Sequence, residues 1–191
     1  SAGPEDHDLA MRPVDYALVW GLVSKRLGAA LDLDSLLDQL TGPADDEETG
    51  PEPRADRATR YRPVVGIDPR HAPPLETLDH ALDRGCVAVA VHPAAAGVHP
   101  CDSDLMPLYE ACADRGVPVF FECDPAAARD AVLAFAKPEL LDEPLRSFPR
   151  LRTLVTGLGD PWIDQGLALL AKHRNCFADL AGMYARPWRL Y

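Results

Sequence analysis

Apolar residues along the chain gather in six short runs, at residues 14–20, 63–67, 86–91, 117–121, 151–156 and 176–180. The runs are short and nearly continuous, as is typical of strands buried on both faces of a parallel sheet. Helical periodicity follows the first five runs, and it predicts helices over residues 24–40, 75–84, 125–136 and 161–173. A further helix is expected between Ser103 and Gly116, since glycine commonly ends a helix.

This alternation of strands and helices predicts right-handed βαβ units and an α/β fold with a parallel sheet. An open doubly wound sheet usually carries GxGxxG after its first strand, and GLVSKRLG at residues 21–28 lacks that spacing. A (β/α)₈ barrel places functional side chains after the carboxyl ends of its strands. Those positions hold Asp68, His92, Glu122, Gly157 and Asp179. We therefore predict a parallel TIM-barrel-like fold with six recognisable units, two fewer than a complete barrel.

The strand–helix rhythm predicts one domain over residues 14–191, preceded by a flexible segment at 1–13. It is interrupted once, at residues 41–62, where the sequence is rich in proline, glycine and charge and nearly free of aliphatic side chains. Such a segment buries too little apolar surface to offset the entropy lost on ordering. We expect a mobile acidic loop there.

Composition narrows the classes of partner. The net charge of −11 disfavours binding to nucleic acid or to anionic lipid. No run approaches the ~20 apolar residues that a membrane span needs. Five cysteines, without a CxxC pair, favour reduced thiols and a cytoplasmic protein. They are Cys86, Cys101, Cys112, Cys123 and Cys176. With nucleic acid and membrane disfavoured, the expected partner is a small-molecule substrate or ligand.

Five segments, taken in order, resemble the amidohydrolase-related superfamily of metal-dependent hydrolases and decarboxylases. They are VGIDPR at 65–70, HP at 92–93, LYEACADRGVPVFFE at 108–122, LRTLVTGLGDPW at 151–162 and NCFADLAG at 175–182. The similarity covers residues 14–182. It implies a TIM barrel that hydrolyses or decarboxylates a small organic acid with one divalent metal, zinc or manganese.

The resemblance also shows where this chain departs from the family pattern. In the family, a His-x-His pair, two further histidines and an aspartate hold the metal at the mouth of the barrel. Here Glu122 stands at the position of the fifth-strand histidine and Gly157 at that of the sixth, and the sequence contains no His-x-His. Two readings stay open: an enzyme with weak or altered activity that binds a metal or no cofactor, and a non-catalytic relative that uses the barrel for binding or regulation.

His92 and Glu122 are the predicted catalytic residues and the predicted ligands of any metal. A histidine that anchors its own loop is an equal alternative for His92. A partly buried Glu122 requires a partner, so a salt bridge to an arginine is the alternative to a general base. His99 and Asp179 are predicted substrate contacts, although Asp179 also suits a turn. Asp68, in GIDPR, is expected to be a structural turn residue.

A six-unit barrel leaves one side of its first and last strands without a neighbour. These are the strands predicted at residues 14–20 and 176–180. Unpaired strand edges tend to pair or to be covered. The sequence therefore predicts a homodimer or a partner subunit over this open seam.

Overall fold

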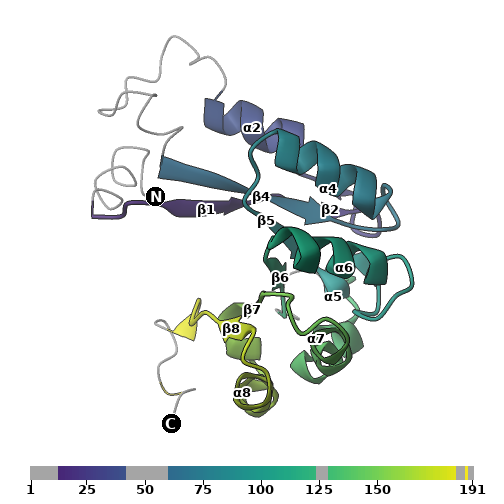
Figure 1. The fold of residues 1–191 in the computed structure, drawn as a ribbon, viewed down its shortest axis with the longest axis vertical. Helices are drawn as coiled ribbons and strands as arrows, with labels where there is room; N and C mark the ends of the chain where they lie inside the picture. Colours follow the sequence, from purple (N-terminus) through teal and green to yellow (C-terminus); the bar gives the residue numbers. More distant parts are fainter. Residues whose placement is uncertain (1–12, 42–59, 124–128, 184–187, 189–191) are drawn as a thin grey trace.

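Six parallel strands form one curved sheet, which is half of a barrel (Figure 1). The computed structural model describes residues 13–41, 60–123, 129–183 and 188. The strands pair in chain order: β1 (Ala17–Trp20), β4 (Tyr61–Ile67), β5 (Ala88–Val91), β6 (Val119–Phe121), β7 (Thr153–Val155) and β8 (Cys176–Ala178). All six predicted strands and their parallel direction are confirmed. Within the described part, β1 and β8 each pair on one side only.

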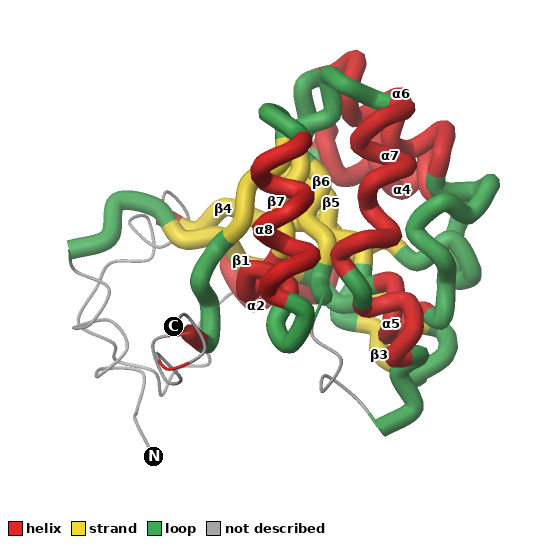
Figure 2. Tube along the Cα trace, turned by 90° about the horizontal axis from the view of Figure 1, so that it is seen from below, coloured by secondary structure: helices red, strands yellow, loops and turns green. Residues whose placement is uncertain are grey.

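The helices cover one face of this sheet, as Figures 1 and 2 show from two directions. They are α2 (Leu33–Thr41), α4 (Pro74–Asp83), α5 (Pro93–Ala96), α6 (Met106–Arg115), α7 (Asp142–Ser147) and α8 (Ile163–Lys172). Three 3₁₀ turns join them: η1 (Leu133–Ala136), η2 (Pro138–Leu141) and η3 (Thr156–Gly159). The helices predicted at 75–84, before Gly116 and at 161–173 are confirmed within one or two residues.

Alternating side chains divide the sheet into two apolar layers. The larger layer packs strand residues such as Val65, Val91 and Phe121 against the helices. We call the other side the inner face. Its side chains are Leu18, Trp20, Arg62, Val64, Ala88, Ala90, Phe120, Leu154 and Phe177. The small side chains of Ala88 and Ala90 let the Trp20 and Phe120 rings meet at a centroid distance of 5.1 Å, although they come from β1 and β6.

The helix predicted over residues 24–40 is wrong in its first half. A small antiparallel hairpin, β2 (Val23–Ser24) with β3 (Ala29–Ala30), stands there, and helix α2 starts only at Leu33. The turn uses Gly28 at φ 64°, a left-handed conformation that suits glycine. The Ser24 hydroxyl donates to the Ala95 carbonyl at 2.8 Å. A contact with a residue 71 positions away thus favours the hairpin over the helix that the local periodicity predicts.

Several sequence predictions fall on residues that the structure does not describe. The N-terminal segment 1–12 and residues 42–59 of the acidic loop lie outside the described residues. The outer residues of the predicted loop belong to regular elements, because α2 runs to Thr41 and β4 begins at Tyr61. Of the helix predicted at 125–136, residues 125–128 lie outside the described residues. The prediction is wrong for residues 129–132, which are not helical, and the last turn is the 3₁₀ turn η1. No helix among the described residues has the length and apolar content to cross a bilayer.

The five cysteine thiols are free, and four of them are buried. Burial raises the pKa of Cys123 and of Cys112 to about 12, and that of Cys86 and of Cys176 to about 11. These thiols are therefore protonated at neutral pH and poor nucleophiles. Cys123, although it is adjacent to Glu122, is therefore poorly suited to act as a nucleophile.

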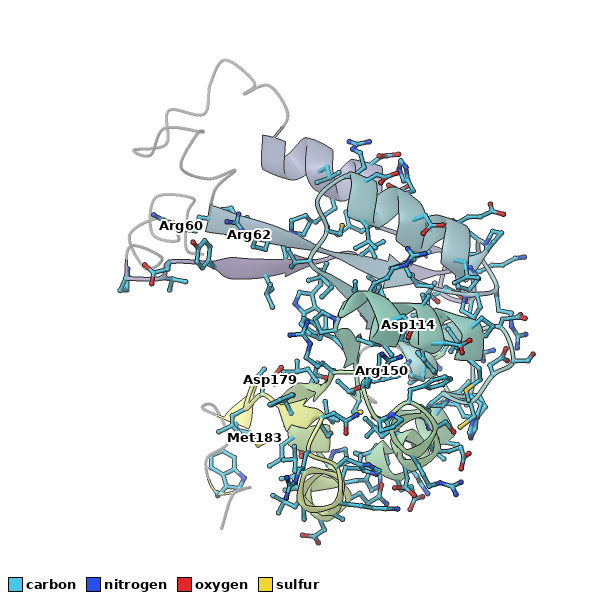
Figure 3. All side chains as sticks on the ribbon, viewed as in Figure 1. Arg60, Arg62, Asp114, Arg150, Asp179 and Met183 are labelled. Atoms are coloured by element: carbon cyan, nitrogen blue, oxygen red, sulfur yellow. The ribbon has the colours of Figure 1, made fainter. Side chains whose placement is uncertain are left out.

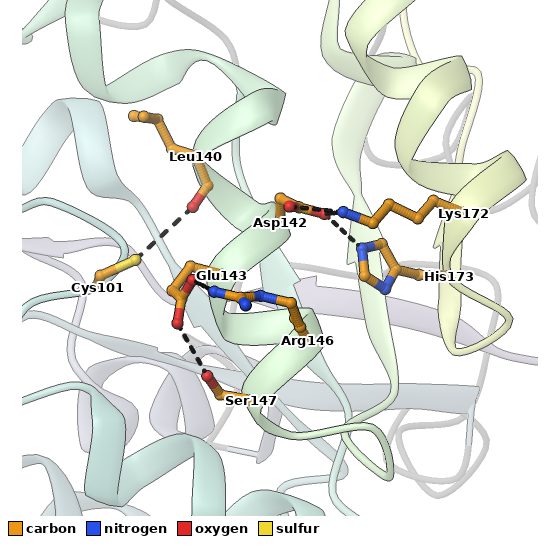
Figure 4. Close-up of polar contacts among 8 residues, drawn as sticks. All are labelled: Cys101, Leu140, Asp142, Glu143, Arg146, Ser147, Lys172 and His173. Carbon is orange, nitrogen blue, oxygen red and sulfur yellow. Dashed lines mark hydrogen bonds and ion pairs between the residues drawn. The ribbon is translucent and has the colours of Figure 1, made fainter.

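Asp142 ties the start of α7 to the end of α8 (Figure 4). The Lys172 ammonium donates to its two carboxylate oxygens at 2.5 and 2.7 Å, and Nε2 of His173 lies 2.7 Å from Oδ1. The bond from Lys172, and then the bond from His173, hold the pKa of Asp142 below its ordinary value of 3.8. Asp142 thus connects α7 to α8 in the outer layer through hydrogen bonds and an ion pair.

Asp142→Asn is expected to make the free energy of unfolding less dependent on pH in acid. Because the folded pKa lies below the unfolded one, the stabilisation is complete above the unfolded pKa of about 4 and is lost as pH falls through the folded value. Urea unfolding at pH 7, 5 and 3 measures this. The matched control is Asp83→Asn, on the exposed end of α4. If the free energy of unfolding fell equally with pH in Asp142→Asn and in wild type, the contacts of Asp142 would not contribute to stability.

Candidate active site

His92 and Glu122 lie side by side at the carboxyl ends of β5 and β6. Val91 and Phe121, the last residues of the two strands, face the helices, so the next residue on each strand turns to the opposite side. The Glu122 amide donates to the Val91 carbonyl at 3.1 Å, which extends the β5–β6 ladder by one residue. The register of the two strands therefore brings together two side chains that are 30 positions apart.

The two side chains form a hydrogen-bonded dyad, which we call the His92–Glu122 dyad. Nδ1 of His92 bonds Oε2 of Glu122. His92 is 5% exposed, whereas Glu122 is 29% exposed and can be reached from solvent. Nε2 of His92 is buried and has no hydrogen-bond partner within the described part of the chain.

The unpartnered Nε2 decides how the proton is placed in the dyad. A buried N–H group without an acceptor is rarer and more costly than an unfilled acceptor. The proton of a neutral His92 therefore sits on Nδ1 and is donated to Oε2, which leaves a lone pair on Nε2. Glu122 accepts this hydrogen bond through Oε2, and its Oε1 makes no hydrogen bond to a described residue. The sequence suggested an arginine as the partner of Glu122 in a salt bridge, but the residue that bonds Glu122 is His92.

The chain around His92 holds the imidazole in place. Helix α5 starts directly after it, and the His92 carbonyl accepts from the Ala96 amide at 2.9 Å. Ser24, in the hairpin, bonds Ala95 of the same helix, and Figure 2 shows α5 and β3 side by side. The contact of His92 with its own loop is made by its backbone carbonyl, whereas its ring contacts Glu122.

Thr156 and Asp179 follow β7 and β8 at the same edge of the sheet. The Thr156 hydroxyl oxygen accepts from the Cys123 amide at 3.2 Å, directly beside Glu122. Oδ1 of Asp179 accepts from the amides of Gly157, at 2.6 Å, and Ala181, at 2.9 Å. Asp179 therefore orders the turns after the last two strands. Sequence reasoning missed Thr156, although a polar residue directly after the apolar run LRTLV was a usable signal.

Asp68 and His99 make contacts of a structural kind. The Asp68 carboxylate, 2% exposed, accepts from the amides of Lys25, at 2.8 Å, and Arg70, at 2.9 Å. It fixes the hairpin to the turn after β4, in line with its expected turn role. Nδ1 of His99 accepts from the Cys101 amide at 3.0 Å, and its ring meets Phe135 edge-on at 5.6 Å. The contacts found for His99 are thus within the loops and not with the dyad.

The described residues do not complete a metal site. Catalytic zinc sites usually use three protein ligands and one open position. The dyad offers two candidate ligands, and nowhere in the described ranges do three His, Cys, Asp or Glu side chains converge as a metal site would need. A cavity of about 320 Å³ lies elsewhere, between α2 and α4 against Val65 and Ile67, and its lining includes neither member of the dyad.

Residues 51–191 match the amidohydrolase family, whose members commonly use divalent metals. An uncharacterised TIM-barrel protein, Bb4693 from Bordetella bronchiseptica, is 20% identical with a TM-score of 0.69, over 91% of this chain and 57% of that one. This likeness shows the barrel fold. No protein with a curated description matches the sequence.

Two further solved structures are similar at lower TM-scores. An amidohydrolase from Mycobacterium avium subsp. paratuberculosis K-10 is 17% identical with a TM-score of 0.49, over 96% of this chain and 53% of that one. The IDCase of Metarhizium anisopliae, in its apo form, is 18% identical with a TM-score of 0.48, over 90% and 50%. The chain spans about half the length of these structures.

Proposed function

Because this chain belongs to the amidohydrolase family, we propose that it hydrolyses a small organic acid derivative with Glu122 as the general base. The observation that carries the proposal is the dyad at the carboxyl ends of β5 and β6. It combines a buried imidazole with a carboxylate that is 29% exposed. In TIM barrels, catalytic groups sit at this end of the strands.

In the proposed reaction, the free Oε1 of Glu122 takes a proton from a water molecule as the water oxygen attacks the substrate carbonyl carbon. The electrons of the carbonyl double bond move to its oxygen. When the tetrahedral intermediate collapses, the bond to the leaving group breaks, and Glu122 returns the proton to that group. The products are an acid and an amine or alcohol. General base catalysis of this kind contributes about 10²–10⁴-fold.

His92 is the positioning residue of this proposal. Its Nδ1–H group holds Oε2 of Glu122, which leaves the second carboxylate oxygen for the water molecule. Decarboxylation, the other activity expected from the family resemblance, would use the same carboxylate to move a proton. Hydrolysis is preferred because a carboxylate base acts directly on water. His99 and Asp179 stay predicted substrate contacts, and binding of zinc or manganese by His92 and Glu122 stays a prediction.

A direct screen tests the proposal. The protein is incubated with small anionic amides, esters and β-keto acids, and product is quantified by NMR, with heat-denatured protein as the blank. We expect hydrolysis of at least one amide or ester in proportion to protein concentration. Elemental analysis of the same preparation measures zinc and manganese, and stoichiometric metal would support the predicted ligand pair. Turnover of only the β-keto acids would replace hydrolysis by decarboxylation.

A non-catalytic binding or regulatory protein is the second candidate. It is favoured by the finding that fewer than three possible metal ligands converge within the described residues. This candidate predicts that small organic acids raise the melting temperature while no compound in the screen is converted. That pattern would overturn the hydrolase proposal.

A further inference from the structure

The inner face carries exposed apolar side chains at both of its edges. Leu18 on β1 is 46% exposed, and Phe177 on β8 is 53% exposed. Both lie on the inner face. Leu18 is two residues before Trp20 on β1, so their side chains point to the same side of the sheet, and Phe177 pairs in register with Leu154. Between these edges the face is filled by its own side chains, since Val64, Ala88 and Ala90 are buried. The exposed apolar surface is thus confined to the two ends of the half-barrel.

The same two strands have unpaired edges. Within the described part, β1 pairs only with β4 and β8 only with β7, in parallel ladders. Each therefore presents backbone N–H and C=O groups with no strand beside them. Soluble proteins usually cover or block such edges. Exposed apolar side chains and unpaired edges coincide here, which indicates a contact surface.

The charges on this surface are complementary to one another. Arg62, early in β4 at the β1 side, lies over the Tyr16 ring at 4.7 Å and meets no carboxylate among the described residues. Asp179, after the end of β8, is bonded only to backbone amides within that part of the chain. Figure 3 shows Arg62 in the upper half and Asp179 in the lower half of the open side of the molecule.

We propose that two copies of this chain pair through their inner faces. In a two-fold contact, when a residue of one copy meets a different residue of the partner, the same pair forms a second time with the roles of the copies exchanged. Arg62 of each copy then faces Asp179 of the other, and Leu18 faces Phe177. A surface that carries both halves of its own charge pairing fits a second copy better than an unrelated partner. The pairing does not depend on the proposed activity.

Apolar burial has to dominate this contact because both copies carry a net charge of −11. Charges separated by more than about 8 Å are largely screened at physiological ionic strength. Local apolar and ionic contacts therefore outweigh the overall repulsion in 0.15 M salt. At low salt the repulsion between the copies grows, and the dimer is expected to weaken.

Sedimentation velocity over a protein concentration series at 0.15 M salt tests the pairing. We expect a dimer for wild type, and at least a tenfold higher Kd for Leu18→Glu and for Phe177→Glu. The matched control is Leu167→Glu, which changes a leucine that is 50% exposed on the outer helix α8. Arg62→Glu should also weaken the dimer, whereas Arg150→Glu, on the helix-covered side, should not (Figure 3).

Circular dichroism and thermal melting show whether each variant is folded. A wild-type monomer at 100 µM would overturn the proposal. So would a dimer whose Kd is the same in wild type, Leu18→Glu and Phe177→Glu, because the contact would then lie elsewhere. Larger assemblies that grow with concentration would also contradict it, since they indicate an open, head-to-tail contact.

Discussion

Glu122→Gln is expected to reduce hydrolysis by about 10²–10⁴-fold, the usual contribution of a general base. The amide keeps the size of the side chain and can still accept a hydrogen bond from Nδ1 of His92, but it cannot take a proton from water. The loss should appear in kcat, with KM nearly unchanged. Steady-state kinetics on the substrate found in the screen measures both.

Glu110→Gln is the matched control, because Glu110 is an exposed glutamate on α6, away from the dyad. His92→Ala should also lower kcat, and added imidazole should restore part of it if the ring acts by holding Glu122. Thermal melting separates these effects from unfolding. If Glu122→Gln keeps wild-type kcat while the wild-type protein is active, Glu122 is not the base.

Gly66→Ala is expected to destabilise the protein by about 3 kcal/mol, at the upper end of the cost of overpacking. A Cβ atom at Gly66 would overlap the carbonyl oxygen of Gly21, and it would lie 2.8 Å from the Gly21 carbonyl carbon and 3.1 Å from the Val23 amide nitrogen. These are backbone atoms, which cannot rotate away as a side chain does. For a chain of this size the loss corresponds to roughly 6–12 °C in Tm.

Gly28→Ala is the control for Gly66→Ala. Gly28 has φ 64° but nothing within 4 Å of an added Cβ, so its substitution costs only the left-handed backbone conformation, about 1–2 kcal/mol. Differential scanning calorimetry of both variants gives the comparison. A Gly66→Ala protein as stable as wild type would show that the segment after β1 does not cross β4 as closely as the structure indicates.

The close approach of Gly21 to Gly66 is one reason that the sequence alone did not predict the hairpin within residues 21–40. It lets the chain cross the end of β4, and the hairpin then bonds Asp68, in the turn after β4, and Ala95, in helix α5. The apolar periodicity of residues 24–40 predicted one helix, because periodicity reports only neighbours along the chain. Contacts made 43 and 71 positions away decided that a hairpin forms first.

The six strands, in contrast, were determined by the sequence alone. A strand buried on both faces needs a short apolar run, and this signal is local. The positions of His92 and Glu122 directly after two such runs were local as well, so both were identified as candidates. Their pairing was not local, because the register between β5 and β6 brings Nδ1 to Oε2. Only the tertiary structure shows that Asp179 binds backbone amides of two different turns, because Gly157 and Ala181 follow different strands.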